Sequence, residues 1–362
     1  MKRRKFLAAA GLAATAATVA RPAIAQSQPD IRWRLASSFP TTLDLIFSGA
    51  QTLAESLRQQ SDGRFTLDIH PAGGLMGALD VFDGVRDGRA ECAQTALTYF
   101  WGKEQALVFA TGVPFGMNAR EQNAFFRRGG GDDLVNDVLA DHALVAFPMG
   151  NTGCQMGGWF RREINSLSDM RGLKLRVSGF AAKIMQTLGV EPRGVSRAEI
   201  AAALSSGSLD AAAWVTPADD EKLELVKVAP NYYYPGFFQP NMTMHLIVSH
   251  AKWNELPRAY QAMLRAACDI ANADVLAKYD AANPAALRRL AEAGVKLRAF
   301  PADIADAMWQ ATEKAHHEAA AADAKYQRLF SAYTDFRNDQ YLWWQVAEYP
   351  FDNFMIRQRA KG

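Results

Sequence analysis

A basic side chain ends a strand pattern in the stretch RGLKLRVSG. Leu173, Leu175 and Val177 recur at every second position, and this period places them on one buried face of a strand. Arg176 lies where the strand gives way to a serine and a glycine, and strand ends of this kind open into ligand crevices in α/β folds. A lone arginine is more often a solvated surface charge. At a crevice, however, its planar guanidinium matches a carboxylate through two parallel hydrogen bonds.

Two further stretches carry side chains that suit ligand binding. In GNTGCQMGG the glycines allow a close approach of the backbone to a ligand, while Asn151 and Gln155 supply amide donors and acceptors. A glycine-rich connection of this kind is more often a simple turn, and it lacks the spacing of a phosphate loop. In YFWGK, Tyr99 and Trp101 are candidates either for the wall of a site or for the core.

The sequence contains no recognisable catalytic constellation. His316 and His317 are adjacent, so on a helix they project about 100° apart and do not converge on one ligand. The other histidines form no H-E-x-x-H pair, and neither a G-x-S-x-G elbow nor a C-x-x-C motif is present. We therefore expect a binding protein and no enzyme. An exported enzyme with a cofactor, and an orphan binding or sensor protein for carboxylates, remain as alternatives.

The first 25 residues predict export. A basic start at residues 2–5, an apolar stretch at 6–19 and a small-residue site at 23–25 are the three parts of a secretory signal peptide, with cleavage before Gln26. The twin arginines of the basic start resemble a Tat signal, with an ordinary Sec signal as the alternative. Without this leader, 35 Lys and Arg stand against 38 Asp and Glu, so no basic footprint for nucleic acid is present.

Cysteines contribute little to the predicted architecture. Cys92, Cys154 and Cys268 are too few and too widely spaced for a disulfide scaffold, and at most one pair can be bridged. We expect each of the three to be a small buried side chain.

The order of the predicted elements indicates an α/β fold with two lobes. Strand and helix patterns alternate in residues 26–150 and again, more weakly, in 151–240, which predicts two α/β lobes with a cleft for a small molecule between them. Residues 241–300 return to complete both lobes and carry a helical pattern interrupted by Pro284. Residues 301–362 form long C-terminal helices with an aromatic tail that either packs on the body or contacts another subunit.

Several collinear motifs carry a family resemblance over almost the whole mature chain. They are the twin-arginine leader, WRLASSFP, YFWGK, VPFGMNAREQNAFF, GNTGCQMGGWFRREINSLSDMRGLKLRV, AAWVTPADDEKLELVKVAPNYYYPGFF and AEYPFDNFM. In this order they resemble the DctP-type periplasmic substrate-binding proteins of TRAP transporters, in particular the branch for α-keto acids and lactate-type 2-hydroxy acids. The resemblance implies a two-lobed periplasmic binding protein that closes on an organic acid and delivers it to a membrane permease.

The resemblance also assigns site residues. It implies that Arg176 holds the substrate carboxylate, that Gln155 contacts substrate and any bound cation, and that Trp214 lines the cleft. The keto-acid branch typically carries a glutamate before this tryptophan and a second acid after YYYPG, where this chain has Ala213 and Gln239. Hard cations prefer anionic oxygen ligands. We therefore expect no cofactor, with Gln155, Trp214 and Gln239 as the only candidate cation ligands.

These implications define the expected ligand and partners. With Arg176 as the clearest fixed charge of the site, we expect a small 2-oxo or 2-hydroxy monocarboxylate. The side-chain amides of Gln155 and Gln239 would contact its keto or hydroxyl oxygen, and Asn151 and Tyr99 are additional expected contacts. Swapped C-terminal helices in some relatives imply that the aromatic tail, between Tyr341 and Phe354, joins two copies in a homodimer. The expected partners are the organic acid and the TRAP permease subunits, and no nucleic acid.

Overall fold

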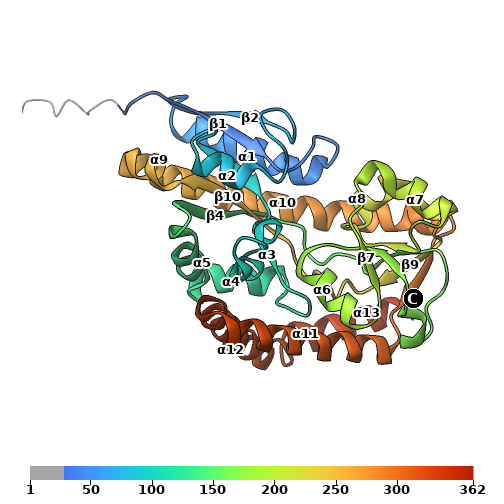
Figure 1. Cartoon of the computed structure of the whole chain (residues 1–362). Coiled ribbons are helices and arrows are strands. Elements are labelled where there is room, and N and C mark those ends of the chain that lie inside the picture. Colours follow the sequence, from blue (N-terminus) through green and yellow to red (C-terminus); the bar gives the residue numbers. More distant parts are fainter. Residues whose placement is uncertain (1–27, 362) are drawn as a thin grey trace, which may run out of the picture.

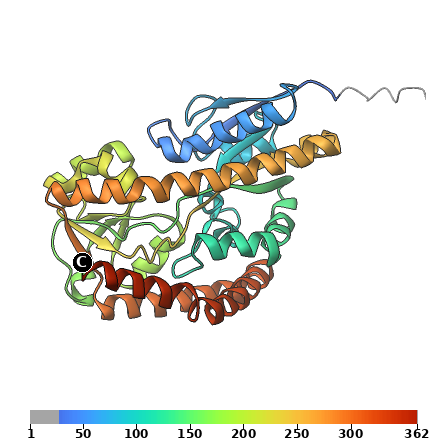
Figure 2. The same ribbon diagram turned by 180° about the vertical axis from the view of Figure 1, so that it is seen from behind.

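The computed structural model describes residues 28–361, so the leader predicted at residues 1–25 lies outside the described residues. Two β-sheets lie side by side, the first formed mainly by the blue to green part of the chain and the second mainly by the yellow-green part, and each takes one strand from a later part of the chain (Figure 1). Helix α10 runs past both, and the red C-terminal helices lie along the opposite side (Figure 2). Within residues 28–361, none of the helices has the length and apolar character that crossing a membrane requires.

The first sheet has the strand order β2-β1-β3-β10-β4. Strand β1 pairs in parallel with β2 and β3, whereas β10 is antiparallel to both of its neighbours. In β1 the buried Trp33 and Leu35 alternate with Arg32 and Arg34, as the sequence pattern predicts. The bounds are β1 Ile31–Ser37, β2 Phe65–His70, β3 Cys92–Thr95, β4 Leu144–Asn151 and β10 Thr243–Ser249.

The second sheet has the strand order β11-β9-β5-β8-β6-β7. Strand β6 pairs in parallel with β7 and β8, and β5 is antiparallel to β8 and β9. The predicted alternation holds here too, because Leu173, Leu175 and Val177 are buried around the more exposed Arg176. The bounds are β5 Gly158–Phe160, β6 Lys174–Arg176, β7 Glu191–Arg193, β8 Ala211–Ala212, β9 Asn231–Tyr234 and β11 Lys296–Ala299.

The α-helices cover the sheets and connect the two lobes. Helix α4 begins with a capping box between Asn118 and Glu121, which satisfies free N–H groups of its first turn. The bounds are α1 Asp44–Gln60, α2 Val81–Arg86, α3 Val108–Thr111, α4 Ala119–Arg128, α5 Gly131–Ala140, α6 Gly179–Thr187, α7 Ile200–Ser206, α8 Pro217–Asp220, α9 His250–Glu255, α10 Arg258–Glu292, α11 Ala302–Ala322, α12 Ala324–Trp344 and α13 Glu348–Arg359.

Helix α10 corrects one expectation. Pro284 does not interrupt it, and the helix continues for 35 residues across both lobes. A proline in a helix interior removes one main-chain hydrogen bond and costs about 3 kcal/mol. Burial on either side of the proline offsets this cost, because Val275 and Tyr279 before it and Ala286 and Leu290 after it are buried.

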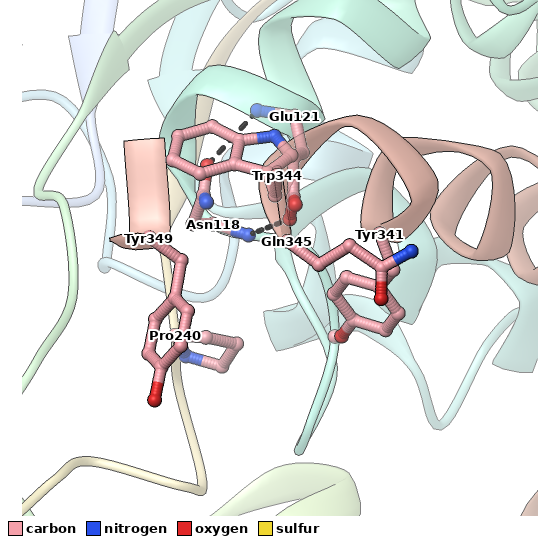
Figure 3. A pocket seen from close by; sticks show the side chains of 8 residues that line it. Asn118, Glu121, Pro240, Tyr341, Trp344, Gln345 and Tyr349 are labelled. Carbon is pink, nitrogen blue, oxygen red and sulfur yellow. Dashed lines mark hydrogen bonds between the residues drawn. The ribbon is translucent and has the colours of Figure 1, made fainter. Parts of the chain in front are cut away.

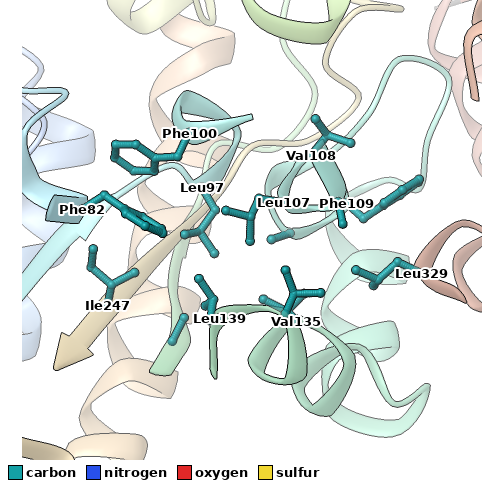
Figure 4. Packing of buried hydrophobic residues seen from close by; sticks show 14 of the residues in the cluster. Phe82, Leu97, Phe100, Leu107, Val108, Phe109, Val135, Leu139, Ile247 and Leu329 are labelled. Atoms are coloured by element: carbon teal, nitrogen blue, oxygen red, sulfur yellow. The ribbon is translucent and has the colours of Figure 1, made fainter. Parts of the chain in front are cut away.

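A large apolar cluster fixes the first sheet to the helices below it. Phe109 is fully buried at its centre, with ring centroids 5.0 Å from Tyr326 and 5.3 Å from Tyr333 of α12. Figure 4 shows the neighbouring side chains Leu107, Val135 and Leu329 converging from separate elements. The C-terminal helix α12 is therefore part of the core of the first lobe.

Two segments connect the first sheet to the second and lie next to each other; we call them the chain crossings. One leads from β4 to β5 and contains Gln155, and the other leads from β9 to β10 and contains Gln239. The crossings pair through their main chains, because Gln155 N donates to Gln239 O at 3.0 Å and Thr152 N donates to Met242 O at 3.2 Å. Residues of both lobes are thus held at one junction.

Candidate functional site

Arg176 lies at the end of β6 with part of its guanidinium already fixed. Nη1 donates to Ala213 O at 2.8 Å, Nε donates to Val195 O at 3.4 Å, and the guanidinium carbon lies 4.6 Å from the centre of the Trp214 ring. Among the described residues, no carboxylate forms an ion pair with Arg176, and Nη2 donates to no protein acceptor. The guanidinium is therefore positioned and retains donor capacity for an anion.

The electrostatics of Arg176 also favour an anionic ligand. Burial lowers the pKa of its guanidinium, while Tyr99 and the carboxylate of Asp220 act in the opposite direction. A partly desolvated cation without a paired carboxylate gains free energy when a ligand supplies the negative charge.

The chain crossings bring Gln155 and Gln239 beside the segment 213–215, which contacts this arginine. Gln155 is only 8% exposed, and Met156 N donates to Val215 O at 3.0 Å, which places Gln155 beside the segment that carries Trp214. The side-chain oxygens of both glutamines accept no hydrogen bond from the described residues. These oxygens are free to contact a ligand or a cation.

Asn151 has a different environment. Its side chain is fully buried, and its amide nitrogen donates at 3.0 Å to both Asn241 Oδ1 and Thr243 Oγ1. Its side-chain oxygen accepts from Gly153 N at 2.9 Å. All its polar atoms are engaged, so we expect Asn151 to organise the crossings and not to contact a ligand directly.

Tyr99 lies in the 3-10 helix Leu97–Phe100 of the first lobe. Its side chain is 38% exposed, and its ring centroid is 6.1 Å from that of Phe39. Burial raises the pKa of its hydroxyl, and the nearby Arg176 partly offsets this rise. Trp101, by contrast, packs against the core cluster of the first lobe.

The donor set available to a cation consists of neutral oxygens. Among residues 28–361, no three His, Cys, Asp or Glu side chains come together as metal ligands. The candidates are the side-chain oxygens of Gln155 and Gln239 and the main-chain oxygen of Trp214, none of which accepts a hydrogen bond within the described chain. Such a set fits a hard cation only if ligand oxygens complete it, because calcium takes six to eight oxygens.

Three further side chains near the site differ in their exposure. Cys154, beside Gln155, is exposed and not a buried apolar side chain, because it lies on the surface of the crossing; Cys92 and Cys268 are buried as expected. Asp219 and Asp220 of α8 are each 1% exposed, although aspartate side chains are mostly exposed in proteins. No local sequence signal distinguishes them, because their burial depends on packing against other elements.

One cavity lies away from Arg176. It has a volume of about 410 Å³ and separates the start of α4 from the C-terminal helices (Figure 3). Its lining residues are Gly116, Asn118, Glu121, Pro240, Tyr341, Trp344, Gln345 and Tyr349.

Comparison with known proteins establishes the family. Residues 36–323 match the model of bacterial extracellular solute-binding protein family 7, DctP. The chain belongs to this family. It is 40% identical over 360 residues to the monocarboxylate 2-oxoacid-binding periplasmic protein of Nostoc sp., covering 98% of this chain and 99% of that protein. The predicted relationship to TRAP transporter solute-binding proteins is thereby confirmed.

Solved structures agree with this assignment. A TRAP solute-binding protein from Bordetella bronchiseptica, a dimer with calcium and picolinate in one active site, superposes with a TM-score of 0.88 at 38% identity, covering 92% of this chain and 99% of that one. A second, from Colwellia psychrerythraea with bound calcium and pyruvate, gives a TM-score of 0.87 at 32% identity, covering 90% and 99%. The predicted two-lobed α/β fold is confirmed.

The same structures correct one expectation. We expected no cofactor because Ala213 and Gln239 stand where the keto-acid branch carries acids. This expectation is wrong, because both solved structures hold calcium together with the organic ligand. The protein is not the sole source of anionic oxygens for a bound cation. A carboxylate ligand itself brings negative oxygens to the cation.

Proposed function

We propose that this chain captures a small 2-oxo or 2-hydroxy monocarboxylate outside the cytoplasm, in the periplasm, and delivers it unchanged to a TRAP permease. The observation that carries the proposal is Arg176, a positioned guanidinium without a carboxylate partner among the described residues. Picolinate and pyruvate, bound by two relatives, both carry a carboxylate next to a lone-pair donor atom. Ligands of this class suit one arginine and a neighbouring amide.

The proposed geometry assigns each contact a role. Arg176 binds the carboxylate through its remaining N–H donors, and Trp214 keeps the guanidinium plane in place by stacking beneath it. The side-chain amide of Gln155 forms a hydrogen bond with the 2-oxo or 2-hydroxyl oxygen of the ligand. Tyr99 contacts the ligand from the first lobe, so ligand binding draws both lobes together.

A bound cation fits the same site. Gln155, Gln239 and the main-chain oxygen of Trp214 would hold it, together with oxygens of the ligand. The cation would offset the negative charge of the carboxylate and fix the orientation of the 2-oxo group. Because the protein donors are neutral, we expect ligand and cation to bind cooperatively.

The decisive test is the affinity of Arg176→Ala for pyruvate, measured by calorimetry in calcium-containing buffer. Truncating a buried, charge-assisted contact costs about 2–5 kcal/mol, so the affinity should fall at least about 30-fold. Lys174→Ala, two residues earlier on the same strand, is the matched control and should retain the affinity. Equal affinities of wild type and Arg176→Ala would remove Arg176 from the site.

We also propose that two copies assemble through the C-terminal helices. Helix α13 has no buried side chain, and its exposed apolar residues include Phe351, Phe354 and Ile356. The cavity beneath α12 and α13 leaves space between these helices and the body (Figure 3). The relative from Bordetella bronchiseptica is a dimer.

A further inference from the structure

The carboxylate of Asp220 lies directly behind the ligand-binding segment. It ends α8, its side chain is 1% exposed, and it accepts three hydrogen bonds. Oδ1 accepts from Val215 N at 2.9 Å, and Oδ2 accepts from Trp159 Nε1 at 3.0 Å and from the Tyr232 hydroxyl at 2.7 Å. No described Lys, Arg or His forms an ion pair with Asp220, so it is not held by a counter-ion in contact.

Two of the three side chains and main-chain groups that donate to Asp220 belong to the second sheet and are buried. Trp159 of β5 and Tyr232 of β9 are register partners in the second sheet. Their rings stack with centroids 4.1 Å apart, and both side chains are fully buried. A carboxylate bonded to both of these side chains is fixed relative to the sheet.

The third donor belongs to the segment that shapes the site. Val215 follows Trp214, whose ring lies under the Arg176 guanidinium, and Ala213 O accepts from Arg176 Nη1. Val215 O in turn accepts from Met156 N, next to Gln155. Asp220 therefore links the sheet to the segment 213–215, which contacts both the arginine and the crossing that carries Gln155.

The charge of Asp220 acts electrostatically on Arg176 without forming a hydrogen bond to it. The Asp220 carboxylate raises the pKa of Arg176 against the effect of burial, yet makes no hydrogen bond to it. Burial raises the pKa of Asp220 itself to about 7, while its three donors act in the opposite direction. Because Asp220 does not contact the guanidinium, its negative charge stabilises Arg176 without using the N–H donors of the arginine. These donors stay available to the ligand.

We propose that Asp220 is a positioning residue, which sets the orientation of Trp214 and Arg176 for carboxylate capture by anchoring Val215 to the buried Trp159 and Tyr232 pair. The ligand part of this inference rests on the proposed function. The anchoring part concerns the segment 213–215 in the free protein and is measured without a ligand.

The test compares Asp220→Asn with Asp219→Asn in the full-length mature protein. Asp219 is a matched control, because it is equally buried and accepts from the Tyr279 hydroxyl at 2.7 Å, but bonds to α10 and not to the segment 213–215. We expect Asp220→Asn to weaken pyruvate binding 10-fold to 100-fold, and Asp219→Asn to change it less than 3-fold. Thermal unfolding of both variants records their loss of stability separately.

A second readout needs no ligand. The emission of Trp214, obtained as the difference between each protein and its Trp214→Phe counterpart, reports on the stacking with Arg176. It should shift to longer wavelength in Asp220→Asn and not in Asp219→Asn. If wild type fails to bind pyruvate but this shift occurs, the proposed ligand is wrong and the anchoring role stands. Equal affinity losses in the two variants, or an unshifted Trp214 emission in Asp220→Asn, would overturn the inference.

Discussion

In the proposed binding mode, the side chain at position 213 would determine the charge of the cation site. On the family resemblance, the keto-acid branch carries a glutamate at this position, where this chain has alanine. The remaining protein donors are neutral, so a free cation gains little from them. In the proposed binding mode, a carboxylate ligand held by Arg176 would complete the ligand set of the cation with its own oxygens. Cation and organic acid are therefore expected to depend on each other more strongly here than in relatives with both acids.

Restoring the acid should separate the two binding events. We expect Ala213→Glu to raise the affinity for calcium alone at least about 10-fold, because a full negative charge replaces a methyl group beside the Trp214 oxygen. Calcium titrations by calorimetry, with and without pyruvate, measure this directly. Ala213→Gln is the control that adds a similar volume without the charge. An unchanged calcium affinity in Ala213→Glu would show that position 213 does not face the cation.

Local sequence patterns predict where a side chain lies within its element, whereas they do not predict contacts between residues that are distant in the sequence. The position of Arg176 at the end of a strand was predictable, because strand alternation and the strand end are both visible within nine residues. Its contact with the ligand stays a prediction. The burial of Asn151 was not predictable, because its side-chain amide donates hydrogen bonds to Asn241 and Thr243, about ninety residues away in the sequence. Asp220 was missed for the same reason, because Trp159 lies 61 residues before it.

At the scale of elements, strand and helix patterns were predictable but sheet order was not. The alternation of β1 and of β6 follows from their sequences. Nothing local indicates that β10 returns to the first sheet and inserts between β3 and β4 in the antiparallel direction. The lobe boundaries at residues 150 and 240 remain predictions.

The insertion of β10 buries a histidine and creates a pH dependence of stability. His245 is 1% exposed, lies with its ring centroid 5.4 Å from that of Phe126, and has no described hydrogen-bond partner for either ring nitrogen. Burial lowers its pKa to about 3. The unfolded chain takes up a proton below the ordinary histidine pKa of 6.5, whereas the folded chain stays neutral. The stability of the fold is therefore fully present above pH 6.5, and His245 reduces it as the pH falls toward 3.

His245→Phe should remove this loss. Urea unfolding at pH 7 and pH 5 measures it, since one histidine contributes up to about 1.4 kcal/mol per pH unit in this window. The variant should also be at least as stable as wild type at pH 7, because two unsatisfied buried nitrogens disappear. His316 is present in both proteins, and burial also lowers its pKa to about 3. Its contribution to the pH dependence of stability is therefore the same in wild type and variant. Asp220, with a pKa raised to about 7 by burial, acts in the opposite direction in both proteins. Identical pH dependence in wild type and variant would contradict this account.

At the scale of the whole molecule, the two ends of the C-terminal segment behave differently. Helix α12 begins inside the core, where Tyr326 and Tyr333 are 1% exposed. Beyond Arg337 its apolar side chains turn to the surface and continue along α13. A run of exposed apolar side chains of this kind is typical of a surface that contacts another molecule. Its exposed members are Tyr341, Leu342, Trp343, Val346, Tyr349, Phe351, Phe354, Met355 and Ile356.

We expect the mature protein to be a homodimer in which each chain lends α13 to the other. Light scattering after size-exclusion chromatography should give twice the chain mass at micromolar concentration. Replacing Phe351, Phe354 and Ile356 by serine should shift the protein to a monomer, because the apolar area that drives association is lost while no buried side chain of the fold is touched. Leu79→Ser, a change of an apolar side chain that is 62% exposed on the first lobe, is the control and should leave the dimer intact. A wild-type monomer across this concentration range, with an unaltered elution volume for the triple variant, would rule out the C-terminal helix as the subunit contact.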